Sequence, residues 1–339
     1  MLTGTRARLS ILAPTRADPI AREATATLSL SKVEFADVSA WDTTADGLVV
    51  PASIDVVGGR VIARVLSEEA GVFVDVTGKS AFNGFALTFD TLTGNARARI
   101  TDAELVADQT TSGITANEVS FDADTLFLNL DALPFARGDT VSVRLGFALD
   151  GGAGAEDLAG YEGRDQISGG DGADRLRGNK GADVISGDGG ADRILGGSGH
   201  DTLRGGDGAD LIKGGPGFDR LLGGAGADTL IGGGGEDEFI FHTVSDSLAE
   251  AAGRDTIIDF VPREDRINLG HIDANEEKRG DQDFRFIGAG SFSDKAGELR
   301  AFAKPSGTYV AGDTDGDGRA DFSIRLDGVQ ALTAGDFIL

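Results

Sequence analysis

Aspartate side chains recur at every ninth position through the middle of this 339-residue chain. They occupy the sixth place of consecutive nine-residue blocks, of which the first begins at Gly160. Carboxylates that repeat so regularly repel one another unless a hard cation lies between them, and carboxylate and carbonyl oxygens together suit Ca²⁺. The spacing therefore predicts a ladder of calcium sites on Asp165, Asp174, Asp183, Asp192, Asp201, Asp210, Asp219, Asp228 and Asp237.

The rest of each block indicates how the aspartates are positioned. Blocks such as GGDGADRLR and GGDGADLIK have glycine at position 4 and a large apolar residue at position 8, and a weaker block precedes them at residues 151–159. Glycine permits sharp turns, and the last three residues suit a short strand with one inward side chain. A flexible glycine-rich linker is the alternative, but a linker does not keep an apolar residue at every ninth position. Because one block buries little, the repeat predicts a stacked solenoid.

The blocks resemble the nonapeptide GGxGxDxUx of the RTX (repeats-in-toxin) proteins. The resemblance implies a parallel β-roll over residues 151–240, in which two blocks form one coil and blocks i and i+2 stack with Ca²⁺ between them. Each ion takes the earlier Asp with carbonyls from positions 2 and 4, and the later Asp with carbonyls from positions 1 and 3. Seven ions follow, between Asp165 and Asp183, Asp183 and Asp201, Asp201 and Asp219, Asp219 and Asp237, Asp174 and Asp192, Asp192 and Asp210, and Asp210 and Asp228.

The same resemblance names the backbone carbonyls. Asn179, Asp188 and Tyr161 replace glycine at position 2, which we expect to be tolerated because only their carbonyls would bind. Glu156 with Asp174 forms a weaker eighth candidate, since the longer Glu side chain misplaces its oxygens. The implied carbonyl ligands are those of Tyr161, Gly163, Gly170, Gly172, Gly178, Asn179, Lys180, Gly181, Gly187, Asp188, Gly189, Gly190, Gly196, Gly197, Ser198, Gly199, Gly205, Gly206, Asp207, Gly208, Gly214, Gly215, Pro216, Gly217, Gly223, Ala225, Gly232 and Gly234.

After the roll, the segment EFIFHTVSDSLAEAAGRDTIIDF, which begins at Glu238, and the rest of the chain resemble the end of the serralysin C-terminal domain, with the cap region at residues 241–339. The resemblance implies a β-rich cap without the protease domain. We expect Phe239 and Phe241 to plug the open end of the roll, as a terminal cap must. Asp246, Asp255 and Asp259 are candidates for further ion sites at that end, and surface acids are an equal alternative.

Two features of the tail could also carry function. Asp313, Asp315, Asp317 and Asp321 form a DxDxDGxxD loop like the start of a Ca²⁺ hand, but Ile324 stands where the bidentate Glu would be. A polar turn between strands is the alternative. The last residues, 336–339, are an acid followed by three apolar residues. By resemblance they belong to an uncleaved signal for type I secretion, and the alternative is a last strand.

The first part of the chain has a different pattern. Residues 1–25 carry two prolines without a period and predict a flexible lead-in. From residue 26 to 150, short alternating segments separated by turns predict an antiparallel β-sandwich of seven to nine strands, with Gly58 and Gly59 in a hairpin turn. The fold class is therefore all-β throughout, with the calcium-loaded roll and its cap following the sandwich.

Few residues suggest catalysis. The chain has no Cys, no HExxH and no GxSxG, and its only histidines are His200, His242 and His271. We expect His200 to be an exposed turn residue. Asp122 and Asp124 lie on one face of a predicted strand and suit a solvated surface, while Trp41 suits core or rim. These absences favour a protein that is not an enzyme.

Composition narrows the function. A net charge of −25 and a pI near 4.4 argue against nucleic acid and anionic membranes as partners. No apolar stretch is long enough for a membrane span, and residues 1–19 lack the apolar segment of a secretory signal, so we expect export by another route. We predict a secreted, extracellular calcium-binding RTX protein, exported by type I secretion machinery, that folds on meeting Ca²⁺. Its sandwich would bind an extracellular glycan or cell surface. The alternative is an extracellular polysaccharide-active or other hydrolytic enzyme with its active site in the N-terminal domain.

Overall fold

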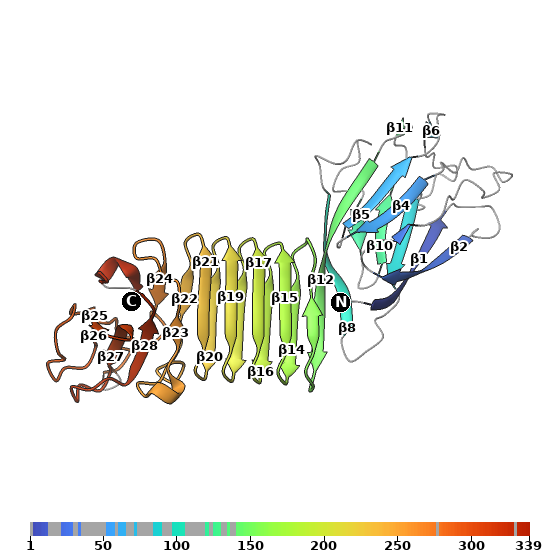
Figure 1. Ribbon diagram of the computed structural model, residues 1–339. Helices are drawn as coiled ribbons and strands as arrows, with labels where there is room; N and C mark the ends of the chain where they lie inside the picture. The colour runs from blue at the N-terminus through green and yellow to red at the C-terminus, as the bar shows by residue number, and fades with distance from the viewer. Residues whose placement is uncertain are drawn as a thin grey trace. The chain divides into compact units, whose positions relative to one another are not determined.

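The protein folds almost entirely as β-strands, which confirms the predicted all-β class (Figure 1). The computed structural model describes residues 140–275, 278–328 and 331–339, and within residues 1–139 the strands named below. Two compact units divide the chain. The first comprises Met1–Leu149 and Gly160–Gln166, and the second comprises Asp150–Ala159 and Ile167–Leu339.

The strands of the first unit pair antiparallel. One sheet has the order β2-β1-β7-β10-β9, β11 pairs with β6, and β3, β4, β5 and β12 pair in sequence. In β4 and β5, Val57 lies opposite Arg60, which confirms the predicted hairpin. The strands are β1 (Thr3–Leu12), β2 (Arg22–Ser29), β3 (Val33–Glu34), β4 (Ala52–Val57), β5 (Arg60–Val65), β6 (Gly71–Val72), β7 (Gly84–Phe89), β8 (Arg97–Leu105), β9 (Val119–Phe121), β10 (Thr125–Asn129), β11 (Pro134–Phe135) and β12 (Thr140–Gly152).

Part of the predicted lead-in is a strand. Strand β1 falls within residues 1–25 and pairs with both β2 and β7. Its alternation of Leu9 and Ile11 with polar residues is the strand signal, and the prolines that follow it obscured this signal in the sequence. Trp41, Asp122 and Asp124 lie outside the described residues, as do most of the side chains on which the predicted sandwich packing depends.

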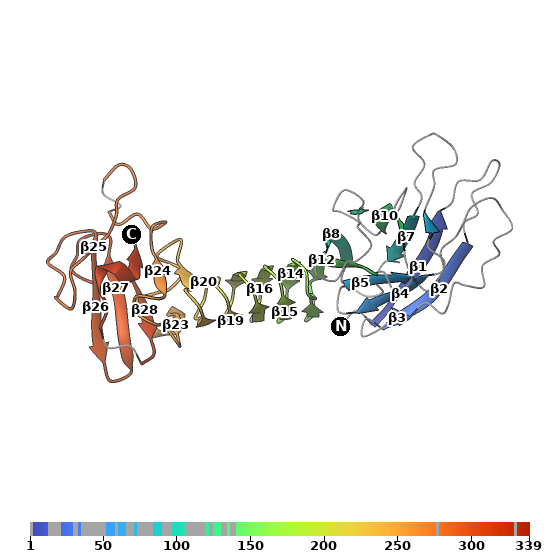
Figure 2. The same ribbon diagram turned by 90° about the horizontal axis from the view of Figure 1, so that it is seen from above.

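The repeats of the second unit form a parallel β-roll, as the sequence predicts. Each repeat contributes a strand to one of two sheets in turn, and strands two apart pair in parallel with a register of 18 residues (Figures 1 and 2). One sheet contains β13 (Asp157–Ala159), β15 (Arg175–Lys180), β17 (Arg193–Ser198), β19 (Leu211–Pro216) and β21 (Thr229–Gly234). The other contains β14 (Gln166–Asp171), β16 (Val184–Gly189), β18 (Thr202–Asp207), β20 (Arg220–Ala225) and β22 (Glu238–Ile240).

The apolar residue at position 8 of every block forms the core of the roll. Ile185, Ile194 and Leu203 are completely buried, and no position-8 side chain in blocks two to nine has any exposed area. Full burial of such a side chain contributes roughly 1.5–3 kcal/mol. The core is one side chain deep in each sheet, so stacking is what removes each apolar residue from water.

Position 4 of the repeat accepts only glycine because two coils come into contact there. Gly208 has φ of 136°, and a Cβ atom on it would lie 1.5 Å from the carbonyl oxygen of Gly190 in the coil below. Position 2 is more permissive. Asn179 and Asp188 adopt φ of 78° and 70° there, a left-handed conformation that Asn and Asp tolerate better than other side chains.

The C-terminal segment continues both sheets beyond the last full repeat. Strands β23 (Thr256–Ile257) and β24 (Arg266–Asn268) stack in parallel on β21 and β22. Phe239 and Phe241 are buried as expected, but the sheets run past them, so the expectation that they plug the end of the roll is wrong. The cap adds β25 (Arg285–Phe286), β26 (Glu298–Lys304), β27 (Gly307–Asp313), β28 (Phe322–Leu326) and β29 (Phe337–Ile338), with 3-10 helices η4 (Ala251–Gly253) and η5 (Ala334–Asp336).

Substitution of Gly208 by Ala tests the contact between coils. We expect Gly208→Ala to lower the free energy of unfolding of the roll by at least about 2 kcal/mol, because the methyl group overlaps a backbone carbonyl and φ is left-handed. Gly234→Ala is the matched control, since nothing lies within 4 Å of its Cβ position. Urea denaturation in saturating Ca²⁺, followed by circular dichroism, measures both. Equal midpoints for the two variants would contradict the packing described here.

Candidate metal centre: the aspartate ladder

The repeat aspartates are buried although they carry charge. Between Asp165 and Asp237 each is only 1–3% exposed. In six repeats the backbone N–H of the Asp donates to Oδ1 of the Asp 18 residues later, for example from Asp174 to Asp192, from Asp192 to Asp210 and from Asp210 to Asp228, each at 2.8 Å. Asp183, Asp201, Asp219 and Asp237 are linked in the same way at 2.8 to 2.9 Å. The structure thus brings together six of the seven predicted Asp pairs, in two ladders, one on each edge of the roll.

The second carboxylate oxygen has no hydrogen-bond partner. Oδ2 is buried and unpartnered in Asp174, Asp192, Asp201, Asp210, Asp219 and Asp228. It faces a glycine at position 1 of its own block and a carbonyl of the next coil. A Cβ atom on Gly187 would lie 2.2 Å from Oδ2 of Asp192 and 2.5 Å from the carbonyl oxygen of Gly205. Glycine at position 1 therefore leaves a small space onto which a carboxylate and a carbonyl oxygen converge.

A site made of such oxygens fits a hard cation. Burial raises the pKa of Asp210 and Asp219 to about 6 and that of Asp228 to about 7, so the charged carboxylates are unfavourable without a counter-charge. Oxygen ligands from carboxylates and carbonyls are those that Ca²⁺ prefers. A Ca²⁺ ion bound there would supply the positive charge that compensates these carboxylates. The ligand role of each individual carbonyl stays a prediction.

The N-terminal end of the ladder differs from its middle. Both oxygens of Asp165 accept backbone hydrogen bonds, Oδ1 from Phe147 at 2.7 Å and Oδ2 from Tyr161 at 2.6 Å. Glu156 takes the place of an Asp, because its N–H donates to Oδ1 of Asp174 at 2.7 Å. Its own Oε2 accepts a hydrogen bond from the N–H of Gly152 at 3.3 Å. Glu156 therefore occupies a ladder position.

At the other end, the ladder extends past the repeats. The N–H of Asp228 donates to Oδ1 of Asp255 at 2.9 Å, and that of Asp237 donates to Oδ1 of Asp265 at 3.0 Å. Oδ2 of Asp255 is buried and unpartnered, and burial together with the neighbouring Asp228 raises the pKa of Asp255 to about 9. From the sequence, Asp255 is a candidate for an ion site with a surface acid as the equal alternative, and Asp265 is not predicted at all. The signal was present in DTII and DRIN, which match positions 6–9 of the repeat without its glycine-rich half.

Two further acids near this end already have donors. The carboxylate of Asp246 accepts hydrogen bonds from the N–H groups of His242 and Thr243, at 2.7 and 3.2 Å. It nevertheless lies close enough to Asp255 to contribute to raising that pKa. Asp259 accepts from the N–H groups of Gly232 and Gly233, at 2.9 Å each. Asp259 thus holds backbone amides at the end of the repeats.

The DxDxDG loop is brought together only in part. Carboxylate oxygens of Asp313, Asp315 and Asp317 lie within 4.8 Å of one another. Asp321 instead accepts hydrogen bonds from the backbone and side chain of Thr314, at 2.6 and 2.8 Å. Internal hydrogen bonds of this kind are those of a polar turn joining β27 and β28.

Each of the three histidine rings contacts another aromatic ring. His200 is exposed, as predicted, and stacks on Phe218 of the next coil with ring centroids 4.9 Å apart. His242 and His271 contact each other edge to face, with centroids 4.5 Å apart.

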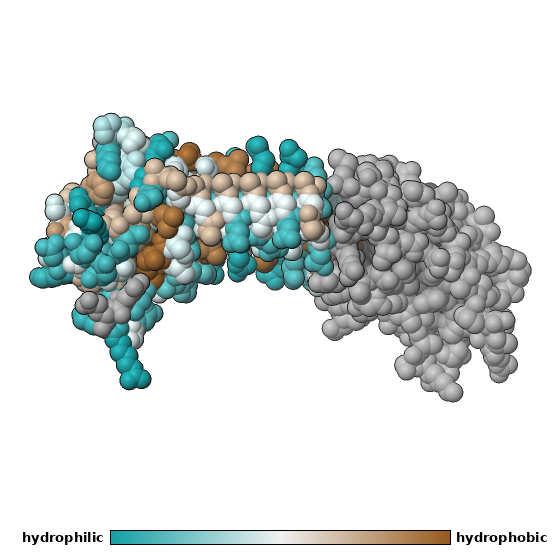
Figure 3. All heavy atoms as spheres, turned by 90° about the horizontal axis from the view of Figure 1, so that it is seen from below, coloured by the Kyte–Doolittle hydropathy of each residue, from teal (hydrophilic) through white to brown (hydrophobic). Residues whose placement is uncertain are grey.

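Figure 3 shows one face of the roll, on which pale rows run along the roll beside hydrophilic side chains.

The fold and the ladder define a solenoid of repeats that presents buried carboxylates to a cation. Residues 150–185, 168–203 and 204–239 match the family model of the RTX calcium-binding nonapeptide repeat. The chain therefore carries RTX calcium-binding repeats across this range, which confirms the resemblance seen in the sequence. Within the described residues, no helix is long and apolar enough to cross a membrane.

Two solved structures are similar to part of the chain. They are solution structures of the AlgE6R3 and AlgE6R2 subunits from the Azotobacter vinelandii mannuronan C5-epimerase. The AlgE6R3 match is 26% identical, with a TM-score of 0.27, and covers 55% of this chain and 78% of that one. The AlgE6R2 match is 24% identical, with a TM-score of 0.28, and covers 56% and 91% respectively. No curated protein matches the chain.

Substitution of Asp210 by Asn tests the ladder. The Asn side chain keeps an oxygen that can accept the Asp192 N–H, but it loses the charge and the second carboxylate oxygen. Asp210 belongs to two of the predicted sites, so we expect about two fewer Ca²⁺ per chain and a higher calcium midpoint. Isothermal titration calorimetry gives the stoichiometry. Asp207→Asn, at an exposed acid three residues away, keeps the backbone carbonyl that is the predicted ligand there and should leave the stoichiometry unchanged; an equal loss of bound ions in both variants would argue against the ladder as the binding site.

The raised pKa values predict opposite pH dependences with and without calcium. A carboxyl whose pKa is near 6 or 7 in the folded state and near 3.8 when unfolded stabilises the fold at low pH, and this stability is lost as pH rises through 6 to 7. In EGTA we therefore expect the roll to become more stable as pH falls from 7.5 to 4.5. With Ca²⁺ present, protons compete with the ion, so acid should weaken it. Urea midpoints measured across this pH range, in EGTA and in Ca²⁺, give the sign of the pH dependence of stability. If stability changes in the same direction with pH in both, the assignment of the ladder as the calcium site is contradicted.

Proposed function

We propose that this is a secreted calcium-binding protein whose roll folds when Ca²⁺ fills the aspartate ladder. The observation that supports it best is the row of buried, unpartnered Oδ2 atoms, most of which face a carbonyl oxygen across a glycine. Repeats of the RTX type indicate a secreted calcium-binding protein. We assign about seven ions to the roll, with Asp255 and Asp265 as further ladder positions at its end.

Calcium should act as a condition for folding. Residues 151–240 carry 17 Asp and Glu against 8 Lys and Arg, and their core is a single apolar side chain per block. Where Ca²⁺ is scarce, chain entropy and charge repulsion exceed the gain from so thin a core, so the roll stays expanded. At extracellular calcium concentrations, the free energy of binding becomes free energy of folding.

The position of the C-terminus fits this order of events. Asp336 is completely buried, and its carboxylate accepts hydrogen bonds from the N–H groups of Arg263 and Thr333, at 2.7 and 2.6 Å. Phe337 is only 5% exposed, within the last strand. A type I secretion signal at residues 336–339 would therefore be readable only before the chain folds. Low calcium inside the cell would keep it accessible until export.

For the first unit, we propose a role in extracellular binding or adhesion. Its residues lack the HExxH and GxSxG motifs of common hydrolases, and it contains no His. Binding of the full chain to a glycan array without release of products would support this role, whereas turnover of a polysaccharide would assign the unit to an enzyme.

Hydrogen–deuterium exchange of the full chain tests the calcium-dependent fold directly. We expect amides in residues 166–240 to exchange rapidly in EGTA and to become protected in millimolar Ca²⁺, because β-pairing forms only when the carboxylates are compensated. Mg²⁺ at the same concentration is the control, since its strict octahedral geometry suits these sites poorly. Protection that is equal in EGTA and Ca²⁺ would overturn the proposal.

A further inference from the structure

The two faces of the roll differ in charge although the same repeat builds both. Strands β13, β15, β17, β19 and β21 carry five Arg or Lys and one Asp, a net of +4. Strands β14, β16, β18, β20 and β22 carry two Arg and four acids, a net of −2. The first face is a basic surface on a chain whose net charge is −25. The calcium sites do not require this positive charge, because the Arg and Lys residues occupy outward positions of the repeat, which are free to vary.

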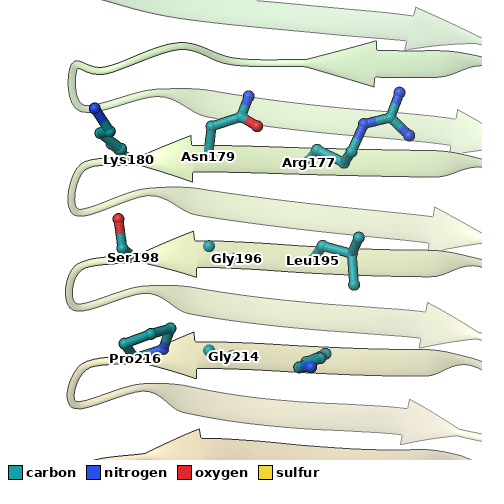
Figure 4. Close-up of a pocket in the computed structure, with 11 residues that line it drawn as sticks. Arg177, Asn179, Lys180, Leu195, Gly196, Ser198, Gly214 and Pro216 are labelled. Atoms are coloured by element: carbon teal, nitrogen blue, oxygen red, sulfur yellow. The ribbon is translucent and has the colours of Figure 1, made fainter.

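A shallow groove lies on the basic face. It encloses about 530 Å³ across β15, β17 and β19, and its lining includes Arg177, Lys180 and Lys213. Figure 4 shows Arg177 and Leu195 in one row across the strands, Lys180, Ser198 and Pro216 in a second, and glycines between the rows. The glycines carry no side chain and form a flat floor, and the longer side chains stand on either side of it.

The register of the strands sets the spacing of the charges. Arg177 pairs with Leu195, and Leu195 pairs with Lys213, so the three occupy the same repeat position on adjacent strands. With strands about 4.8 Å apart, the two cations stand roughly 10 Å apart along the roll, with an apolar side chain between them. Leu195 is 41% exposed. A ligand that runs along the roll would therefore meet a cation, an apolar surface and a second cation in turn.

We propose that this groove binds a linear polysaccharide that carries carboxylate groups, lying along the axis of the roll. Arg177 and Lys213 would pair with successive carboxylates, and Leu195 would pack against the apolar face of a sugar ring. The polar residues at the strand ends would meet hydroxyl groups. Arg177 already contacts the carboxylate of Asp157, with both side chains partly exposed. Among the described residues, no acid pairs with Lys213, so its charge is available to a ligand.

Nucleic acid fits this surface less well. Single strands bind through bases stacked on aromatic rings, and β15, β17 and β19 contain no aromatic residue. Duplex DNA carries a negative charge about every 1.7 Å of its axis. Cations roughly 10 Å apart on a strongly acidic protein match that density poorly. A polymer with fewer, spaced charges and many hydroxyl groups matches it better.

Binding of labelled oligosaccharides to the calcium-loaded full chain tests the proposal. The probes are short galacturonate oligomers and hyaluronan, which carry carboxylates, with neutral dextran and duplex DNA for comparison. Fluorescence anisotropy should show binding of at least one carboxylated probe, weaker at high salt, and none of dextran. The double variant Arg177→Gln with Lys213→Gln should weaken that binding about tenfold, from two lost charge contacts.

Arg204→Gln with Arg220→Gln is the matched control. It removes the same charge from the opposite sheet, and Arg204 occupies the same repeat position as Arg177 and Lys213. We expect less than a twofold change in affinity. Circular dichroism in Ca²⁺ verifies the fold of both variants, and Lys213→Gln alone should give about threefold weaker binding if the double variant misfolds. The proposal fails if neither carboxylated probe binds, if both double variants lose equal affinity, or if DNA binds more tightly.

Discussion

Burial of like charges is the constraint on which this roll depends. Two rows of carboxylates lie along its edges, each almost inaccessible to water, and six of the repeat aspartates keep one oxygen without a partner. Removing a carboxylate from water costs several kcal/mol even after the protein relaxes. The backbone N–H bond to Oδ1 offsets part of that cost and fixes the carboxylate's orientation. The Oδ2 atoms of these six aspartates remain without a hydrogen-bond donor, and they recur at a regular spacing along the roll. A cation bound at each step would explain this regular spacing.

Each position of the nonapeptide answers a different physical requirement. Position 8 fills the core, position 6 forms the ladder, and glycines at positions 1 and 4 admit the carboxylate and the neighbouring coil. The outward positions meet no such requirement. They can therefore carry Arg and Lys on one sheet and acids on the other without disturbing the roll. A repeat fixed at its inner positions leaves its surface free for recognition, so calcium binding and ligand binding can be separate properties of the same strands.

The sequence allowed the repeated part of the fold to be predicted almost completely, because every requirement there recurs at a fixed spacing. The burial of Ile194 follows from the period, and the pairing of Asp174 with Asp192 follows from the resemblance of that period to the RTX repeat. Beyond residue 240 the requirements persist but the period does not. Asp265 stands 28 residues after Asp237, since loops of the cap replace the glycine turns. Without a fixed spacing, an Asp-x-Ile segment is too short to recognise. Strand β1 was missed for a different reason, because the prolines that follow it obscured its short alternation of apolar and polar residues.

The end of the solenoid also has a physical explanation. A parallel sheet that simply stopped would expose unpaired N–H and C=O groups, on which another chain could continue the stack. Here one sheet ends at β29 and the other, through the antiparallel strands β26 to β28, at β25. Both terminal strands are two residues long, so little edge remains for another chain. The antiparallel strands have an apolar core of their own, with Leu299, Val310 and Ile324 completely buried. The cap is therefore stabilised by apolar packing, whereas the roll that it closes depends on compensation of its buried charges.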